Sequence, residues 1–133
     1  MPKNWSKNTP KKKTPMIAIV DDDEAVRKAT QTLIRSLGYR AATFSSVEEF
    51  LGSKRLHETS CVISDVQMPG LTGIELQERL AANGHRIPII FITAFPDDRT
   101  RDRAMRSGAV SFMSKPYSEA NLIVCLDRAL KAA

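Results

Sequence analysis

The sequence predicts a single α/β domain in which a doubly wound, five-stranded parallel sheet is covered by five helices. From Met16 onward, five short apolar runs alternate with five amphipathic stretches. The first run, Met16 to Val20, is apolar throughout, as expected of a strand that is buried on both faces. Such alternation is typical of parallel sheets with right-handed helical crossovers. A chain of 133 residues provides one hydrophobic core and not two.

Each predicted strand is a short run dominated by apolar or β-branched residues, which favour strands over helices at this length. In chain order the predicted strands are residues 16–20, 40–44, 61–64, 87–93 and 110–114. The second of these runs has the weakest pattern. The third run leads directly into Asp65, and the fourth ends at Thr93.

Each predicted helix carries an apolar stripe, a start signal or a stop signal. In chain order the predicted helices are about 26–37, 47–55, 73–82, 98–106 and 119–130. Gly38 and Gly108 end the first and the fourth helix, as C-terminal glycines do. Ser46–Glu49 and Thr72–Glu75 have the spacing of capping boxes, which predicts that helices begin there. Ser118 is expected to cap the last helix.

The charge of the chain is concentrated at its beginning. The lysines of residues 1–15 account for the whole formal net charge of +5, so the remainder is neutral. We expect residues 1–15 to be a flexible basic leader and residues 16–133 to form the folded domain. The leader has one aromatic residue and no recognition helix, so only weak, salt-sensitive contact with nucleic acid is expected of it.

Composition also bears on the cellular location and on the cysteines. No secretory signal opens the chain, and the longest apolar run, residues 87–94, is too short to cross a bilayer. The sequence therefore predicts a cytoplasmic protein without membrane contact. Cys61 and Cys125 match neither a disulfide framework nor a zinc motif, and we expect both to be buried free thiols.

Polar side chains stand at the carboxyl ends of four of the five predicted strands. Asp21 and Asp22 follow the first strand, Asp65 the third, Thr93 ends the fourth, and Lys115 follows the fifth. Open parallel sheets bind their ligands at this edge. Three carboxylates that meet there would repel one another unless a cation or a proton lies between them. We therefore expect these residues to form one functional site.

The chemistry of these side chains suits phosphoryl transfer. Hard oxygen ligands with room for water favour Mg²⁺ or Mn²⁺. A carboxylate beside such a metal can act as a nucleophile toward phosphorus and form an acyl phosphate. The metal, the Lys115 ammonium and the Thr93 hydroxyl would then share the charge of the phosphoryl oxygens.

From Met16 to about Lys131 the chain resembles the receiver domain of bacterial two-component response regulators. The residues that carry the resemblance are Asp21 and Asp22, Asp65 within Ser64–Gly70, Thr93, and Lys115-Pro116. It implies a flavodoxin-like (CheY-like) sheet with strand order 2-1-3-4-5. The surroundings of Asp21 and of Lys115-Pro116-Tyr117 are most similar to the nitrogen-fixation (FixJ-type) branch. Members of that branch usually carry a helix-turn-helix DNA-binding domain afterwards.

The resemblance also implies a role for each residue of the site. Asp65 would accept a phosphoryl group from a sensor histidine kinase or a histidine phosphotransfer protein. Asp22 and Asp65 would bind Mg²⁺ (or Mn²⁺) directly, Asp21 would bind it through water, and Gln67 would contribute its backbone carbonyl. The side chain of Gln67 would lie near the path of the water that later hydrolyses the phosphoryl group.

The same resemblance implies a conformational switch. Thr93 would move toward the phosphoryl group, Phe112 would turn inward behind it, and Lys115 would change partner from carboxylate to phosphate. Lys115-Pro116 would be a cis peptide. The face made by the fourth helix, the fifth strand and the fifth helix would then bind a partner or form a homodimer. Such a domain is a regulatory phosphoacceptor and not an enzyme. DNA would be reached only through an output domain not present in this chain.

Two other interpretations remain at this point. Asp21 and Asp23 form an Asp-x-Asp pair after a buried strand, as in haloacid-dehalogenase-like phosphohydrolases, where Asp21 would be the nucleophile. That interpretation leaves Asp65 without a role. The chain could also be an interaction module that has lost phosphorylation, although all five site residues are present.

Overall fold

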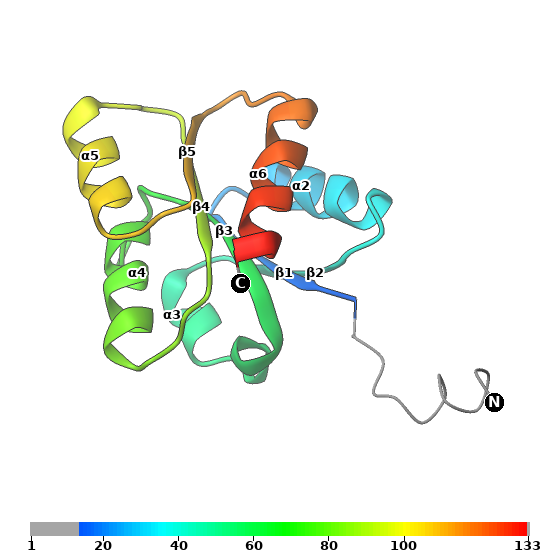
Figure 1. Cartoon of the computed structure of the whole chain (residues 1–133), viewed down its shortest axis with the longest axis horizontal. Helices are drawn as coiled ribbons and strands as arrows, with labels where there is room; N and C mark the ends of the chain where they lie inside the picture. Colours follow the sequence, from blue (N-terminus) through cyan, green and yellow to red (C-terminus); the bar gives the residue numbers. More distant parts are fainter. Residues whose placement is uncertain (1–13, 133) are drawn as a thin grey trace.

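The computed structural model describes residues 14–132, which form a parallel five-stranded sheet between two layers of helices (Figure 1). The strands are hydrogen-bonded in the order β2-β1-β3-β4-β5, so the predicted fold and strand order are confirmed. Their bounds are β1 Met16–Val20, β2 Arg40–Phe44, β3 Thr59–Asp65, β4 Ile89–Thr93 and β5 Ser111–Ser114. The predicted leader lies outside the described residues except for Thr14 and Pro15. The Pro15 carbonyl accepts a hydrogen bond from Arg40 N at 3.0 Å, which attaches this end of the leader to β2.

Five α-helices and one short 3₁₀ helix connect the strands. They are α2 Glu24–Ser36, α3 Val47–Leu51, η1 Lys54–Glu58, α4 Gly73–Ala82, α5 Asp98–Arg106 and α6 Glu119–Ala132. In Figure 1, α2 and α6 cover one face of the sheet, and α3, α4 and α5 cover the other. None of the helices within residues 14–132 combines the length and the apolarity that a bilayer crossing requires.

The capping predictions are confirmed for α4 and only partly for α3. Thr72 and Glu75 form a complete capping box at the start of α4. The Ser46 hydroxyl accepts from Glu49 N at 3.0 Å, but the Glu49 carboxylate accepts from Ser45 N, so the second half of the predicted box is wrong. Both caps still fix where their helices begin.

The predicted second helix ends too late, because the structure divides it. Helix α3 ends at Leu51, and Gly52 is its C-cap. The Ser53 hydroxyl accepts from Arg55 N at 3.0 Å and opens the separate 3₁₀ helix η1. A serine that offers its hydroxyl to the backbone interrupts a helix and starts a new turn. The fourth strand also begins later than predicted, after Pro88, which has no N–H to donate to the sheet.

Two hydrophobic clusters stabilise the sheet, one on each face. In β1, Ala18 and Val20 pack into one cluster, while Ile17 and Ile19 pack into the other. All residues of this strand are buried, which confirms the expectation drawn from its apolar run. The second cluster includes Cys61 and Cys125, and both are buried free thiols as predicted.

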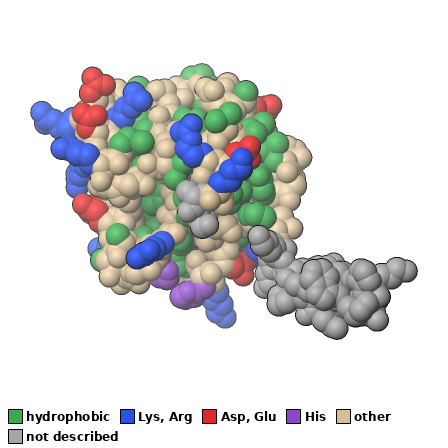
Figure 2. Space-filling model, viewed as in Figure 1, with side chains coloured by type: hydrophobic (Ala, Val, Ile, Leu, Met, Phe, Trp, Pro, Cys, Tyr) green, Lys and Arg blue, Asp and Glu red, His purple; other side chains and the backbone are tan. Residues whose placement is uncertain are grey.

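The surface of α5 is strongly charged. Figure 2 shows basic and acidic side chains gathered over α5 at the upper left of the molecule. Arg103 lies 3.4 Å from Glu78 of α4, and both side chains are more than half exposed. Exposed pairs of this kind contribute little to stability, so this surface is available for other contacts.

Candidate functional site

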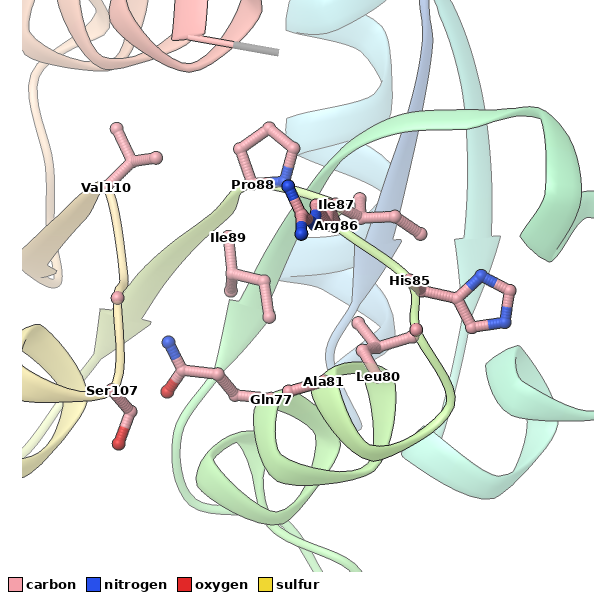
Figure 3. A pocket seen from close by; sticks show the side chains of 12 residues that line it. Gln77, Leu80, Ala81, His85, Arg86, Ile87, Pro88, Ile89, Ser107 and Val110 are labelled. Carbon is pink, nitrogen blue, oxygen red and sulfur yellow. The ribbon is translucent and has the colours of Figure 1, made fainter.

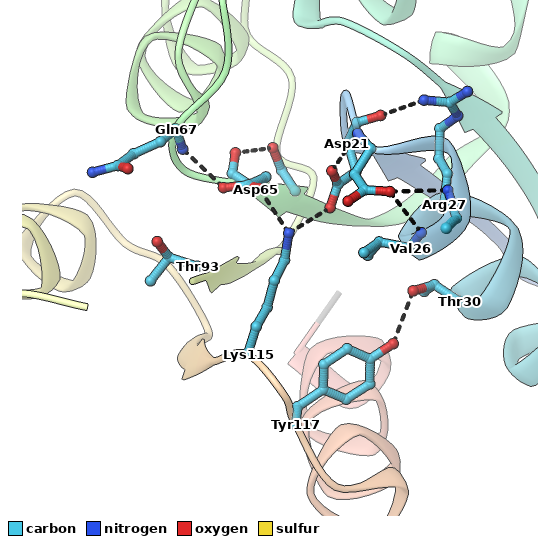
Figure 4. Close-up of polar contacts among 12 residues, drawn as sticks. Asp21, Val26, Arg27, Thr30, Asp65, Gln67, Thr93, Lys115 and Tyr117 are labelled. Atoms are coloured by element: carbon cyan, nitrogen blue, oxygen red, sulfur yellow. Dashed lines mark hydrogen bonds and ion pairs between the residues drawn. The ribbon is translucent and has the colours of Figure 1, made fainter. Parts of the chain in front are cut away.

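The carboxyl edge of the sheet brings the predicted site residues together (Figure 4). Asp21 directly follows β1, Asp65 is the last residue of β3, and Thr93 is the last residue of β4. Lys115 follows β5. Because all five strands are parallel, their ends meet at one edge, as the sequence predicted.

Lys115 contacts two carboxylates at once. Its Nζ atom donates to Asp65 Oδ2 at 2.8 Å and to Asp21 Oδ2 at 2.9 Å. The Lys115 side chain is only 17% exposed, which makes these pairs more significant than surface salt bridges. The contact with Asp65 was expected, whereas the contact with Asp21 was not.

The environment of Lys115 keeps its ammonium charged. Burial acts to lower the pKa of Lys115, but hydrogen bonds and attraction from Asp65 and Asp21 outweigh burial and raise it above its usual value. The site therefore holds a permanent positive charge between two acidic side chains.

The carboxylate of Asp65 is held at both oxygens. Its Oδ2 accepts from Lys115, and its Oδ1 accepts from Gln67 N at 2.9 Å. The side chain is buried, with 8% of the residue exposed. These two contacts orient the carboxylate at the end of β3, and the Gln67 side chain is exposed beside it.

The three acidic residues after β1 have different environments and different hydrogen-bond partners. Asp21 is buried, and its Oδ1 accepts from Asp23 N at 2.9 Å. Asp23 is the N-cap of α2, where its Oδ1 accepts from Ala25 N and Val26 N. Asp22 is exposed and offers a carboxylate oxygen to the same cluster as Asp21 and Asp65.

The donor set fits a hard divalent cation. One carboxylate oxygen from each of Asp21, Asp22 and Asp65 lies within 4.8 Å of the others. Mg²⁺ prefers carboxylate oxygens and retains several waters, and the exposure of Asp22 leaves access for solvent. Asp22, Asp65 and Asp21 are thus suitably arranged to hold such an ion.

Thr93 and Phe112 occupy neighbouring strands behind the carboxylates. Thr93 is almost fully buried, and its Oγ1 accepts from Phe95 N at 3.1 Å. Phe112 is partly buried, lies opposite Phe91 in the register of β4 and β5, and packs against the cluster beneath α4 and α5. The main chains join here too, because Lys115 N donates to Thr93 O at 2.7 Å.

Several residues that support the site were not predicted to do so. Gly73 begins α4, and a Cβ atom there would lie 2.6 Å from the Asp65 carbonyl oxygen and 2.8 Å from Phe91 Cε1. Only glycine lets α4 approach the end of β3 so closely. Glu48 of α3 accepts from Leu71 N at 3.3 Å and so holds the loop after Asp65. For Gly73, the one signal in the sequence was its position directly after the capping residue Thr72.

The connection after β5 is fixed by a contact with α2. The Lys115-Pro116 peptide is cis, as expected. The Tyr117 hydroxyl lies 2.8 Å from Thr30 Oγ1, and Thr30 is buried within α2 (Figure 4). This hydrogen bond holds the segment that carries Lys115 against α2. No local sequence pattern predicted the bond.

Comparison with known proteins gives a consistent result. The profile of the response regulator receiver domain matches residues 17–127. The chain is 42% identical over 118 residues to the response regulator protein TmoT of Ectopseudomonas mendocina, covering 89% of this chain and 54% of that protein. It is 36% identical over 117 residues to the transcriptional regulatory protein FixJ of Bradyrhizobium diazoefficiens, covering 88% and 57%. The chain thus spans about half the length of the curated relatives it matches.

Solved structures agree with this result. The structure of the response regulator StyR superposes with a TM-score of 0.83 at 40% identity, over 90% of this chain and 61% of that chain. The FixJ-N crystal structure gives a TM-score of 0.82 at 30% identity, over 92% and 98%. The FixJ-N match therefore covers nearly the whole of both chains.

Proposed function

Since the chain belongs to the response regulator receiver domain family, we propose that it is a phosphorylation-dependent switch in which Asp65 accepts the phosphoryl group. The donor would be a sensor histidine kinase or a histidine phosphotransfer protein. The observation that carries the proposal is the position of the Asp65 carboxylate, which is buried at the strand edge and held by Gln67 N and Lys115 Nζ. A fixed carboxylate of this kind is a suitable nucleophile.

The transfer itself requires a single exchange of bonds. A carboxylate oxygen of Asp65 attacks phosphorus while the bond from phosphorus to the donor's imidazole nitrogen breaks, and the imidazole leaves with its electron pair. Asp22 and Asp65 would hold Mg²⁺ directly, Asp21 would hold it through water, and the Gln67 backbone carbonyl would complete the protein ligands. When bound, this ion would neutralise charge on the phosphoryl oxygens.

Lys115 and Thr93 would stabilise the phosphorylated state. Lys115 already points its ammonium at Asp65 Oδ2, so it needs little movement to contact a phosphoryl oxygen instead. Thr93 Oγ1 now accepts from Phe95 N, and its own proton remains available for donation. Movement of Thr93 toward the phosphoryl group would leave space for Phe112 to turn inward.

The consequence would be a change at the face formed by α5, β5 and α6. Its α5 surface combines the mixed charges described above with a partly exposed Met105. Mixed charges can pair reciprocally across a two-fold axis, so a second copy of the domain is one occupant of this face. In a longer protein, an output domain would be regulated there. The curated relatives include transcriptional regulatory proteins, and we propose transcription as the output.

The haloacid-dehalogenase-like alternative gains no support from the site. Its nucleophile, Asp21, has one oxygen on Lys115 and the other on Asp23 N. Its second acid, Asp23, caps α2. Asp21 and Asp65 are both paired at each carboxylate oxygen, so these contacts do not separate the two candidates. The engagement of Asp23 at the start of α2 and the match to the receiver domain family support Asp65 as the phosphoacceptor.

The experiment that tests the proposal locates the phosphorylated residue. The chain is incubated with acetyl phosphate and Mg²⁺, and the acyl phosphate is trapped by borohydride reduction and located by peptide mass spectrometry. We expect modification of Asp65, with no incorporation into Asp65→Asn and none when Mg²⁺ is chelated. Modification of Asp21 would favour the phosphatase interpretation. Absence of any acyl phosphate would favour the interaction module.

A further inference from the structure

The two histidines of the chain lie side by side, although they stand at positions 57 and 85 of the sequence. Their ring centroids are 5.7 Å apart, and the ring planes are inclined by 57°. Figure 2 shows the two side chains next to each other at the lower edge of the molecule. The chain has no other histidine, so the fold brings both of its imidazole side chains together.

The sheet register explains why the two residues meet. His57 belongs to η1, which leads into β3 at Thr59, and His85 belongs to the segment that leads into β4 at Ile89. Strands β3 and β4 are parallel neighbours. Their leading segments therefore lie side by side at the edge where the strands begin, which is opposite to the edge that carries Asp65.

Both histidines stand on segments that hydrogen bonds hold in place. At the end of η1, the hydroxyl of Thr59, the first residue of β3, donates to Arg55 O at 2.7 Å. In the α4–β4 connection, His85 N donates to Leu80 O at 2.9 Å. His85 is one of the residues that line a cavity of about 500 Å³, and Figure 3 shows its ring pointing away from Gln77 and Ile89, which also line that cavity. His57 is exposed and His85 is half-buried, so both rings can be reached from solvent.

The side chains that the pair offers are imidazoles and not carboxylates, which favours a metal that binds nitrogen. Glu58, the acid next to His57, lies 3.4 Å from both Arg40 and Arg55, so its carboxylate is already paired. Within residues 14–132, the one group of three or more potential metal-binding side chains is the acidic cluster at the opposite edge. A hard cation such as Mg²⁺ would select that cluster, whereas imidazole suits zinc, nickel and copper.

We propose that His57 and His85 together bind a transition-metal cation of the zinc class, with water in the remaining coordination positions. Zn–N bonds are about 2.0–2.1 Å, so two imidazoles on one tetrahedral ion have ring centres roughly 5–6 Å apart. The separation of 5.7 Å in the structure falls within that range. Rotation of the exposed His57 ring and the half-buried His85 ring would direct one nitrogen of each toward a shared ion. Such an ion links the leading segments of β3 and β4.

Calorimetric titration of the untagged chain with Zn²⁺ tests this site, with excess Mg²⁺ present to occupy the acidic cluster. His57→Gln and His85→Gln each remove one of the two chelating groups, and we expect each to weaken Zn²⁺ binding by at least about tenfold. Arg86→Gln, a change at the exposed neighbour of His85, is the matched control and retains full affinity. Equal Zn²⁺ affinity in the original chain and both histidine variants would overturn the proposal, as would no binding at all.

A second measurement locates the ion without relying on the variants. Substoichiometric Cu²⁺, which is paramagnetic, broadens nuclear magnetic resonance signals near its binding site. We expect the amides of residues 57 and 85 to broaden first in the presence of excess Mg²⁺. Broadening that begins around residues 21, 22 and 65 instead would reject the site and leave the proposed phosphoacceptor function intact.

Discussion

Lys115 is bonded to Asp21 as well as to Asp65, with its Nζ atom 2.9 Å from Asp21 Oδ2. The ammonium therefore separates two buried carboxylates that would otherwise repel each other. Asp21 and Asp65 also belong to the carboxylate cluster that could hold a divalent cation, so Lys115 and such a cation would share these two partners. The protein supplies one positive charge to the cluster, and a bound metal would add to it.

Replacing Lys115 by methionine should destabilise the chain mainly when metal is absent. The variant retains an apolar stem but leaves Asp21 and Asp65 without a counter-ion, and removing one partner of a buried pair costs about 3 kcal/mol. Urea unfolding with and without Mg²⁺ measures this loss. We expect Mg²⁺ to recover more stability in the variant than in the original chain; an equal gain in both would show that Lys115 does not neutralise the cluster.

Replacing Asp22 by asparagine should weaken Mg²⁺ binding with little effect on folding. Asp22 is exposed, and exposed substitutions usually change stability by no more than about 0.5 kcal/mol. Mg²⁺ titration by calorimetry or nuclear magnetic resonance measures the affinity. The control is Asp127→Asn, which removes an exposed carboxylate from α6. If both variants bind Mg²⁺ as well as the original chain does, Asp22 is not a ligand.

Replacing Gly73 by alanine should lower the stability of the chain and disturb Asp65, the proposed phosphoacceptor. The added methyl group would lie 2.6 Å from the Asp65 carbonyl oxygen, so α4 or β3 must move. Overpacking of this kind costs about 1–3 kcal/mol. We expect lower unfolding free energy and slower labelling of Asp65 by acetyl phosphate. Gly52→Ala is the control, since its nearest contact is 3.4 Å away; similar behaviour of the two variants would refute the steric argument.

The stability of the chain should fall at alkaline pH because of Cys61. Burial raises the pKa of its thiol to about 12, with a smaller effect from Cys125. The unfolded chain loses this proton near its ordinary pKa of about 8.5, whereas the folded chain keeps it. Above that pH the unfolded state binds fewer protons, so the unfolding free energy decreases, by at most about 1.4 kcal/mol per pH unit.

Urea unfolding of the original chain and of Cys61→Ala at about pH 7.5, 9 and 10 separates this contribution from other titrations. The variant is less stable at neutral pH because it leaves a cavity, but its stability should decline less steeply. Parallel pH profiles for the two proteins would show that the Cys61 thiol does not contribute. As a direct check, Cys61 should resist thiol reagents in the folded chain, since it is completely buried.

The sequence predicted where most of the candidate site residues lie, because their positions depend on sheet topology. Parallel strands end at one edge, so Asp21, Asp65 and Lys115 could be placed together from strand ends alone. The contact of Lys115 with Asp21 could not be anticipated, since it depends on the path of one long side chain. The hydrogen bond between Thr30 and Tyr117 could not be anticipated either, because it joins two elements that are far apart in the chain.

Element boundaries were predicted less well than element order. The division between α3 and η1 rests on Gly52 and Ser53, whose local hydrogen bonds compete with helix continuation. The Glu49 carboxylate accepts from Ser45 N, whereas the capping-box spacing predicts Ser46 N as its partner, and the sequence pattern did not distinguish the two. Such choices are settled by small energy differences that spacing rules do not contain.

Lys115 N donates to the Thr93 carbonyl oxygen, so the main chains of these two site residues are joined directly. Thr93 contributes a hydroxyl and Lys115 a charge, and the bond between their main chains lies next to Thr93 and Ser114, the last register pair of β4 and β5. Because the two residues share this bond and lie at one site, substitutions at the two positions should have combined effects that differ from the sum of their separate effects.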